Sequence, residues 1–130
     1  MSYTMSTTLA RPYAESVEAV RAALTEQGFG VLTEIDLKAT LKAKIDAEIA
    51  PYVILGACRP PLAHKAVLAD PSVGALLPCN VVVRAQDDTT TLVEALDPDV
   101  MMSVADTPEL KEVAADARQR LSAALESLSS

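Results

Sequence analysis

Alternating apolar and polar residues predict a set of short strands. In the first of these, Met5 and Leu9 fall on one face, while Thr4, Ser6 and Thr8 fall on the other, which is the pattern of a half-buried strand. The other strand segments are rich in β-branched or aliphatic residues and are bounded by turn-forming residues. The predicted strands span residues 3–10, 29–35, 52–56, 80–86 and 89–96.

Apolar residues at steps of three and four predict four helices. The first three span residues 12–27, 36–45 and 60–70, and the last begins at 108 and carries its apolar repeat to Leu128. In the second helix Leu37, Leu41 and Ile45 are expected to face inward, with lysines facing outward. In the last helix the repeat favours packing on the protein's own sheet over a dimer contact. That repeat consists of Leu110, Ala114, Ala117, Leu121, Ala124 and Leu128.

Together these elements predict an α+β, two-layer fold. We expect a mixed sheet of about five strands with helices mainly on one face. The sequence does not decide whether the strand after Pro78 runs parallel or antiparallel to the strand before Gly56. The chain of 130 residues is expected to form a single domain over 1–126, followed by a flexible C-terminal tail at 127–130. Half of the residues are apolar, but aromatic residues are rare, so the core should be aliphatic and rich in alanine.

Charge and composition exclude several classes of partner. The formal net charge of −7 argues against nucleic-acid binding, which needs clustered Lys and Arg. No apolar segment is long enough to cross a membrane, and the N-terminus lacks the basic and apolar regions of a secretory signal. We therefore expect a cytoplasmic protein without a membrane partner, in which the two cysteines are reduced.

The residues with the most reactive side chains gather between positions 52 and 83. Both cysteines, Cys58 and Cys79, and the one histidine, His64, lie there, and we take them as candidate catalytic residues. Cys58 and Arg59 precede a proline pair that fits the start of a helix. The positive end of that helix and the neighbouring Arg59 are expected to lower the pKa of the Cys58 thiol. Thiol, sulfur-transfer or redox chemistry, with Cys79 as the resolving partner, is therefore one hypothesis.

A second hypothesis is a non-catalytic binding module for a small molecule or an anion. Prolines and glycines at the strand ends would shape a pocket, and backbone N–H groups at the helix N-terminus would hold an anion. These residues also meet a plain need for sharp turns. The ligand-binding candidates are Gly56, Cys58, Arg59, Pro60, His64, Pro78, Cys79 and Asn80.

Other chemistry is weakly encoded. One histidine without a serine elbow gives no hydrolase triad. Cys58, Cys79 and His64, with Met101 or Met102, would suit a soft ion such as Cu(I) only if the fold brought them together. We predict no metal and no cofactor, and the sequence leaves open whether the protein is an enzyme. A third hypothesis is a structural protein that acts through a dimer surface.

Three blocks of sequence resemble a known family. They are Ile54 to His64, Leu76 to Val83 and Gly28 to Asp36. Together they are similar to the uncharacterised bacterial and archaeal family three hundred and two among the domains of unknown function. The resemblance extends from about Thr4 to Leu125. It implies a small α+β domain that forms a homodimer, and it carries no assigned activity or catalytic residue.

Overall fold

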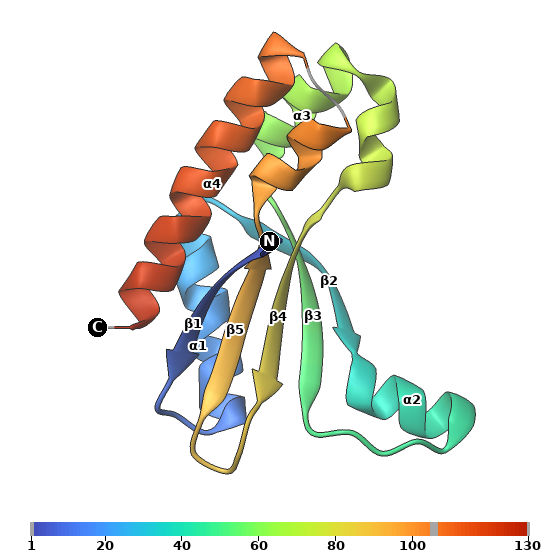
Figure 1. Ribbon diagram of the computed structural model, residues 1–130, viewed down its shortest axis with the longest axis vertical. Helices are drawn as coiled ribbons and strands as arrows, with labels where there is room; N and C mark the ends of the chain where they lie inside the picture. The colour runs from blue at the N-terminus through green and yellow to red at the C-terminus, as the bar shows by residue number, and fades with distance from the viewer. Residues whose placement is uncertain (1, 105–106, 130) are drawn as a thin grey trace.

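The computed structural model describes residues 2–104 and 107–129, which form a sheet with helices packed on it (Figure 1). The strands are β1 (Thr4–Leu9), β2 (Gly30–Asp36), β3 (Tyr52–Cys58), β4 (Cys79–Ala85) and β5 (Thr91–Leu96). The helices are α1 (Tyr13–Glu26), α2 (Leu37–Ile45), α3 (Pro60–Ala69) and α4 (Pro108–Leu128). Two 3-10 helices, η1 (Pro71–Leu76) and η2 (Pro98–Ser103), were not predicted. The predicted α+β fold is confirmed.

The sheet is fully antiparallel, so the expectation of a mixed sheet is wrong. Its strand order is β1-β5-β4-β3-β2, and every neighbouring pair runs antiparallel. Strands β1 and β2 run in the same direction, as strands joined by a crossover helix do. They occupy opposite edges of the sheet, however, and β5, β4 and β3 separate them. No parallel pair therefore forms.

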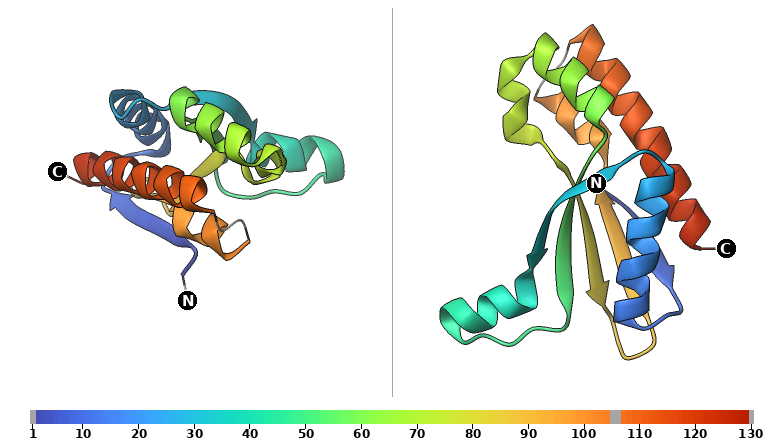
Figure 2. Two further views of the ribbon diagram at one scale, coloured as in Figure 1. Left: turned by 90° about the horizontal axis from the view of Figure 1, so that it is seen from above. Right: turned by 180° about the vertical axis from the view of Figure 1, so that it is seen from behind.

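Helices α1 and α4 cover one face of this sheet, as Figure 2 shows from behind. The predicted repeat of α4 is confirmed, because all six of its residues are buried. α4 continues to Leu128, which packs in the core. The range 127–130, predicted to be a flexible tail, thus begins inside the helix, and Ser130 lies outside the described residues.

Buried side chains form two clusters along α4. One lies between the sheet, α1 and the C-terminal half of α4, and it is built from aliphatic residues and alanines, as predicted. The other lies between the N-terminal half of α4, α3 and the two 3-10 helices. The candidate site described below lies where the two clusters meet.

Helix α2 departs from its predicted packing. None of its residues is buried, and Ile45 is 69% exposed, although Leu37, Leu41 and Ile45 were expected to face inward. The helix lies beyond the ends of β2 and β3, away from α1 and α4 (Figure 1). Its apolar stripe therefore faces neither of the cores that the described residues form.

Candidate functional site

The turn from β3 into α3 is shaped by close packing around Gly56. A side chain at this position would overlap Thr33 Oγ1 of β2, and its Cβ would lie 2.8 Å from Pro78 Cγ. Gly56 is buried because these two residues cover it. Pro78 follows a cis peptide bond with Leu77. Two of the predicted ligand-binding residues, Gly56 and Pro78, thus pack against each other, which gives both a structural role.

The register of β3 and β4 decides how the two cysteines lie. Cys79 is directly opposite Ala57. Since neighbouring residues of a strand point to opposite faces, the side chains of Cys58 and Cys79 leave the sheet in different directions. Both cysteines are free thiols, and the two are not near each other. The predicted cysteine pair is therefore wrong, although the strands do return antiparallel.

Burial also changes the chemistry of both thiols. It raises the pKa of the Cys58 thiol above its ordinary value. It raises the pKa of Cys79, which is more deeply buried, to about 11. The predicted lowering of the Cys58 pKa is therefore wrong. A neutral thiol is a poor nucleophile, so neither cysteine is prepared for attack at neutral pH.

The start of α3 offers no free backbone donors for an anion. Pro60 and Pro61 have no N–H group. The next two N–H groups, of Leu62 and Ala63, both donate to the carbonyl oxygen of Arg59 at 3.0 Å. The first turn is thus closed on itself, and the predicted anion site on backbone N–H groups does not exist in this form.

Arg59 turns toward α4 and does not lie beside the thiol. Its Nη1 donates to Asp116 Oδ2 at 3.5 Å, which is a long hydrogen bond. Its Nε is buried and has no hydrogen-bond partner in the described ranges 2–104 and 107–129. At Gly28 a Cβ would lie 3.0 Å from this Nε. Gly28 therefore makes room for the arginine, and its positive φ of 84° suits glycine.

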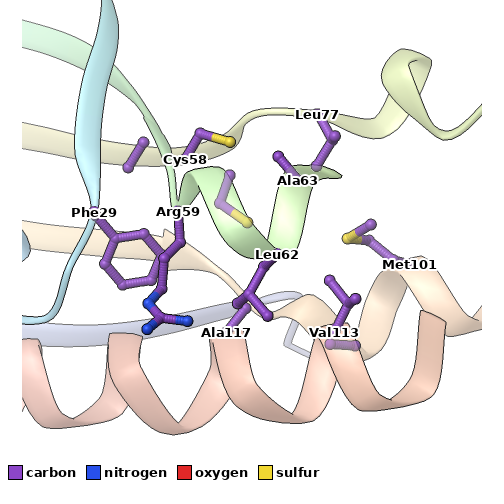
Figure 3. Close-up of a pocket in the computed structure, with 12 residues that line it drawn as sticks. Phe29, Cys58, Arg59, Leu62, Ala63, Leu77, Met101, Val113 and Ala117 are labelled. Carbon is purple, nitrogen blue, oxygen red and sulfur yellow. The ribbon is translucent and has the colours of Figure 1, made fainter. Parts of the chain in front are cut away.

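Gly28 also places an aromatic ring at the site. It ends α1 in a Schellman arrangement, in which the Gly28 N–H donates to Thr25 and the Phe29 N–H donates to Leu24, both at 3.0 Å. The chain reverses there, and Phe29 is buried next to Arg59 at one end of a cavity (Figure 3).

This cavity lies between the end of the sheet, α3, η2 and α4. With its open mouth it encloses about 390 Å³, but only about 30 Å³ of this is free for water-sized molecules, enough for one or two. It is therefore narrow. Its wall is almost entirely apolar, apart from the two thiols and Arg59. The lining residues are Phe29, Ala57, Cys58, Arg59, Leu62, Ala63, Leu77, Cys79, Met101, Val113, Ala114 and Ala117.

Three of the predicted site residues thus line one cavity: Cys58, Arg59 and Cys79. His64 is exposed on α3, and Asn80 is exposed on β4, and neither lines the cavity. Pro60 is exposed at the start of α3. The structure therefore brings together only part of the predicted set.

Sequence reasoning missed the charged cluster that holds Arg59. Asp116 accepts from Arg59 through one oxygen and from Arg120 Nε through the other, at 2.8 Å. Arg120 Nη1 also donates to the carbonyl oxygen of Gln27 at 3.4 Å. The spacing of Asp116 and Arg120 by four residues on a helix was a visible signal. The contact with Arg59 was not, because 57 positions separate it from Asp116.

Within the described ranges, His, Cys, Asp and Glu form no group of three or more that could hold a metal ion. The soft-ion site with His64 therefore finds no support. The helices of the described part also lack the combination of length and apolar character that a membrane crossing needs.

Comparison with known proteins places the chain in a family. The family model described as "Domain of unknown function DUF302" matches residues 5–128, which is nearly the whole chain. The chain belongs to the DUF302 family. None of the curated proteins matches it.

A solved structure agrees with this DUF302 fold. It is the crystal structure of an uncharacterized conserved DUF302 protein from Bacillus stearothermophilus, with a TM-score of 0.88 and 30% sequence identity. The match covers 98% of this chain and 99% of that one. The family resemblance expected from the sequence is thus confirmed, and the description of this relative names no activity.

Proposed function

We propose that this DUF302 domain binds a slender, largely apolar small molecule in the cavity beside Arg59. The ligand would place an alkyl-like portion along the apolar wall and a hydrogen-bond acceptor at the guanidinium group. The observation that carries the proposal is the state of Arg59. Its Nε is buried without a partner in the described part of the chain, and Arg59 is one of the residues that line an otherwise apolar cavity.

An unsatisfied buried donor has an energetic cost that a ligand could remove. Leaving such a group without a partner costs about 1–3 kcal/mol, and more for a charged group. Among the described residues this guanidinium bonds to Asp116 alone, and that bond is long at 3.5 Å. A ligand acceptor would restore the missing hydrogen bonding, while the apolar wall would supply affinity by burying hydrocarbon.

The shape of the cavity favours a thin ligand. Small-molecule sites usually enclose roughly 300–1,000 Å³. The free space inside this cavity, about 30 Å³, is far below that range, so a ligand would also have to occupy the open mouth. A single alkyl chain fits this form better than a ring system. Thiol chemistry receives less support, because the pKa of each cysteine is raised.

Hexanamide, a neutral chain with an acceptor, is a suitable first probe. We expect it to shift the NMR signal of the Met101 methyl group, which lines the cavity, and to raise the melting temperature. Ala63→Leu should fill the cavity and abolish both effects. Ala69→Leu is the matched control, because Ala69 lies on the same helix, is exposed and does not line the cavity. Binding that survives Ala63→Leu, or no binding at all, would refute the proposal.

A second candidate function is self-association, which the incompletely covered stripe of α2 favours: Ile45 is exposed, and Leu37 and Leu41 are only half-buried. A helix of nine residues is short for independent stability in water, where roughly 12–15 residues are needed. It therefore gains from packing its apolar side. An open groove lies between α2 and the sheet, and its free space of about 520 Å³ compares with about 30 Å³ in the cavity. Tyr3, Leu41, Ile49 and Tyr52 are among the residues that line this groove.

We propose that a second copy of this chain covers α2. The helix stripe and the groove beside it lie next to each other on one chain, so two copies can insert one into the other about a two-fold axis. Leu41→Asp should then shift a dimer to monomer in sedimentation experiments. Val67→Asp on α3 is the control, because Val67 is an apolar helix residue that is 41% exposed but lies away from the groove, whereas Leu41 is half-buried against it. A wild-type protein that sediments as a monomer at about 100 μM, roughly the range of weak dimers, would exclude this function.

A further inference from the structure

The charges around Asp116 do not balance. Two guanidinium groups, of Arg59 and Arg120, share this single carboxylate, and each engages a different oxygen of it. The described residues supply no other carboxylate to either arginine. The cluster therefore retains about one positive charge, although the chain as a whole has a formal net charge of −7.

We infer that the ligand of the cavity is an anion, namely a short-chain carboxylate whose head group binds Arg59 while its chain lies along the apolar wall. This inference rests on the proposed binding function and names the chemical class of the ligand. Arg59 belongs to both features, since it lines the cavity and is bonded to Asp116. Figure 3 shows its guanidinium between Phe29 and Leu62, next to α4.

Arginine suits this role because its planar fork matches a carboxylate. The Arg59 side chain is 22% exposed, so the charge is partly shielded from water and interacts more strongly than a surface charge. The net negative charge of the chain repels an anionic ligand at Arg59 only weakly. At physiological salt, exposed charges more than about 8 Å away are largely screened.

Arg120 has a separate, indirect part in this arrangement. Its bond to Asp116 is the shorter of the two, 2.8 Å against 3.5 Å, so it holds the carboxylate and leaves Arg59 incompletely neutralised. Arg120 is thus a positioning residue. Removing it should let Asp116 neutralise Arg59, whereas removing the charge of Asp116 should leave Arg59 fully available to a ligand.

The test compares two ligands of equal chain length, hexanoate and hexanamide, in 0.15 M salt, with the Met101 methyl signal as the readout. We expect wild-type protein to bind hexanoate about tenfold more tightly than hexanamide, an ordinary contribution for one charge-assisted contact. Arg120→Gln should remove most of that preference. Asp116→Asn should increase it by roughly threefold or more.

Arg118→Gln is the matched control for Arg120→Gln. It removes the same charge from the same helix, but Arg118 pairs with Asp97 and Asp99, away from the cavity. It should keep the wild-type preference. Equal affinities for the two ligands in wild-type protein, or a weaker preference in Asp116→Asn, would overturn the anion inference and leave the proposed binding function standing. Failure of both ligands to bind would overturn the binding function itself.

Discussion

Helices α2 and α4 have the same kind of sequence but opposite surroundings. Each has apolar residues at steps of three and four, and each begins at a side-chain cap, Asp36 for α2 and Thr107 for α4. Yet α4 buries eight residues, and α2 buries none. An apolar stripe thus predicts a helix, but it does not say whether the covering surface belongs to the same chain.

Position in the fold explains the difference. α4 has 21 residues and lies along both buried clusters, so its whole stripe meets the sheet, α1 and α3. α2 has nine residues and lies where β2 ends and β3 begins, beyond the covered face (Figure 1). The first helix closes the core of this domain. The stripe of α2 is the surface that we propose a second copy covers.

Leucine truncation gives the sharpest contrast between the two helices. Leu121→Ala in α4 should lower the free energy of unfolding by about 2–5 kcal/mol, because Leu121 is 1% exposed and its loss leaves a cavity. Leu41→Ala in α2 should change the unfolding of the monomer by less than about 0.5 kcal/mol. Urea denaturation at low protein concentration measures both.

The concentration dependence of unfolding refines this contrast. If α2 is a dimer surface, Leu41→Ala should destabilise the protein at high concentration and leave it unchanged at low concentration. A large loss of stability for Leu41→Ala in the dilute monomer would mean that α2 belongs to the core after all.

Removing the helix caps tests the same comparison, with an expected loss of stability about half as large as that from leucine truncation. Thr107 accepts from the Leu110 N–H at 3.2 Å, and Asp36 accepts from the Ala39 N–H at 2.9 Å. Thr107→Ala should cost about 1 kcal/mol of global stability, since α4 unfolds with the core. Asp36→Ala should leave the global free energy of unfolding nearly unchanged, and it should speed amide hydrogen exchange within α2 alone. Equal global losses in the two variants would show that the helices unfold together.

Much of this fold could be predicted because it depends on local pattern. Alternation located β1, β-branched or aliphatic composition between turn residues located the other strands, and the repeat of α4 gave six of its eight buried residues. The antiparallel sheet could not be predicted in the same way. It depends on β1 and β2 reaching opposite edges, and that choice is made by the packing of the whole chain.

In the candidate site, too, the sequence predicted some features and not others. Cys58, Arg59 and Cys79 were identified from their unusual neighbourhood, and all three line the cavity. Their chemistry was misjudged, because burial raises the pKa of both thiols and the side chain of Arg59 turns to Asp116. Both facts come from tertiary contacts between distant parts of the chain, which local sequence does not report.

The smallest expected effect is on the pH response of the two helices. Each helix takes part in a lysine–glutamate pair: Lys42 of α2 pairs with Glu48, which follows the helix, and Glu112 of α4 pairs with Lys65 of α3. In both pairs the lysine lowers the pKa of the glutamate below its ordinary value of 4.5. A lowered carboxyl pKa contributes stability above 4.5, and this stability is lost as the pH falls through the lowered value. Both pairs are exposed, so the change should be slight.

Only α2 should show this change in its structure, because core packing holds α4 in place. Acidification from about pH 6 to about pH 3, across the usual carboxyl range, should shift the Cα signals of α2 toward unfolded values and leave those of α4 unchanged. Glu48→Gln should reduce the response of α2 over this interval, because the cap Asp36 and the Lys42–Asp46 pair still respond to acid, while Glu112→Gln should leave that response unaltered. A parallel shift in α4 would mean that acid loosens the core as well, and the separation between a core helix and a partner-facing helix would then fail.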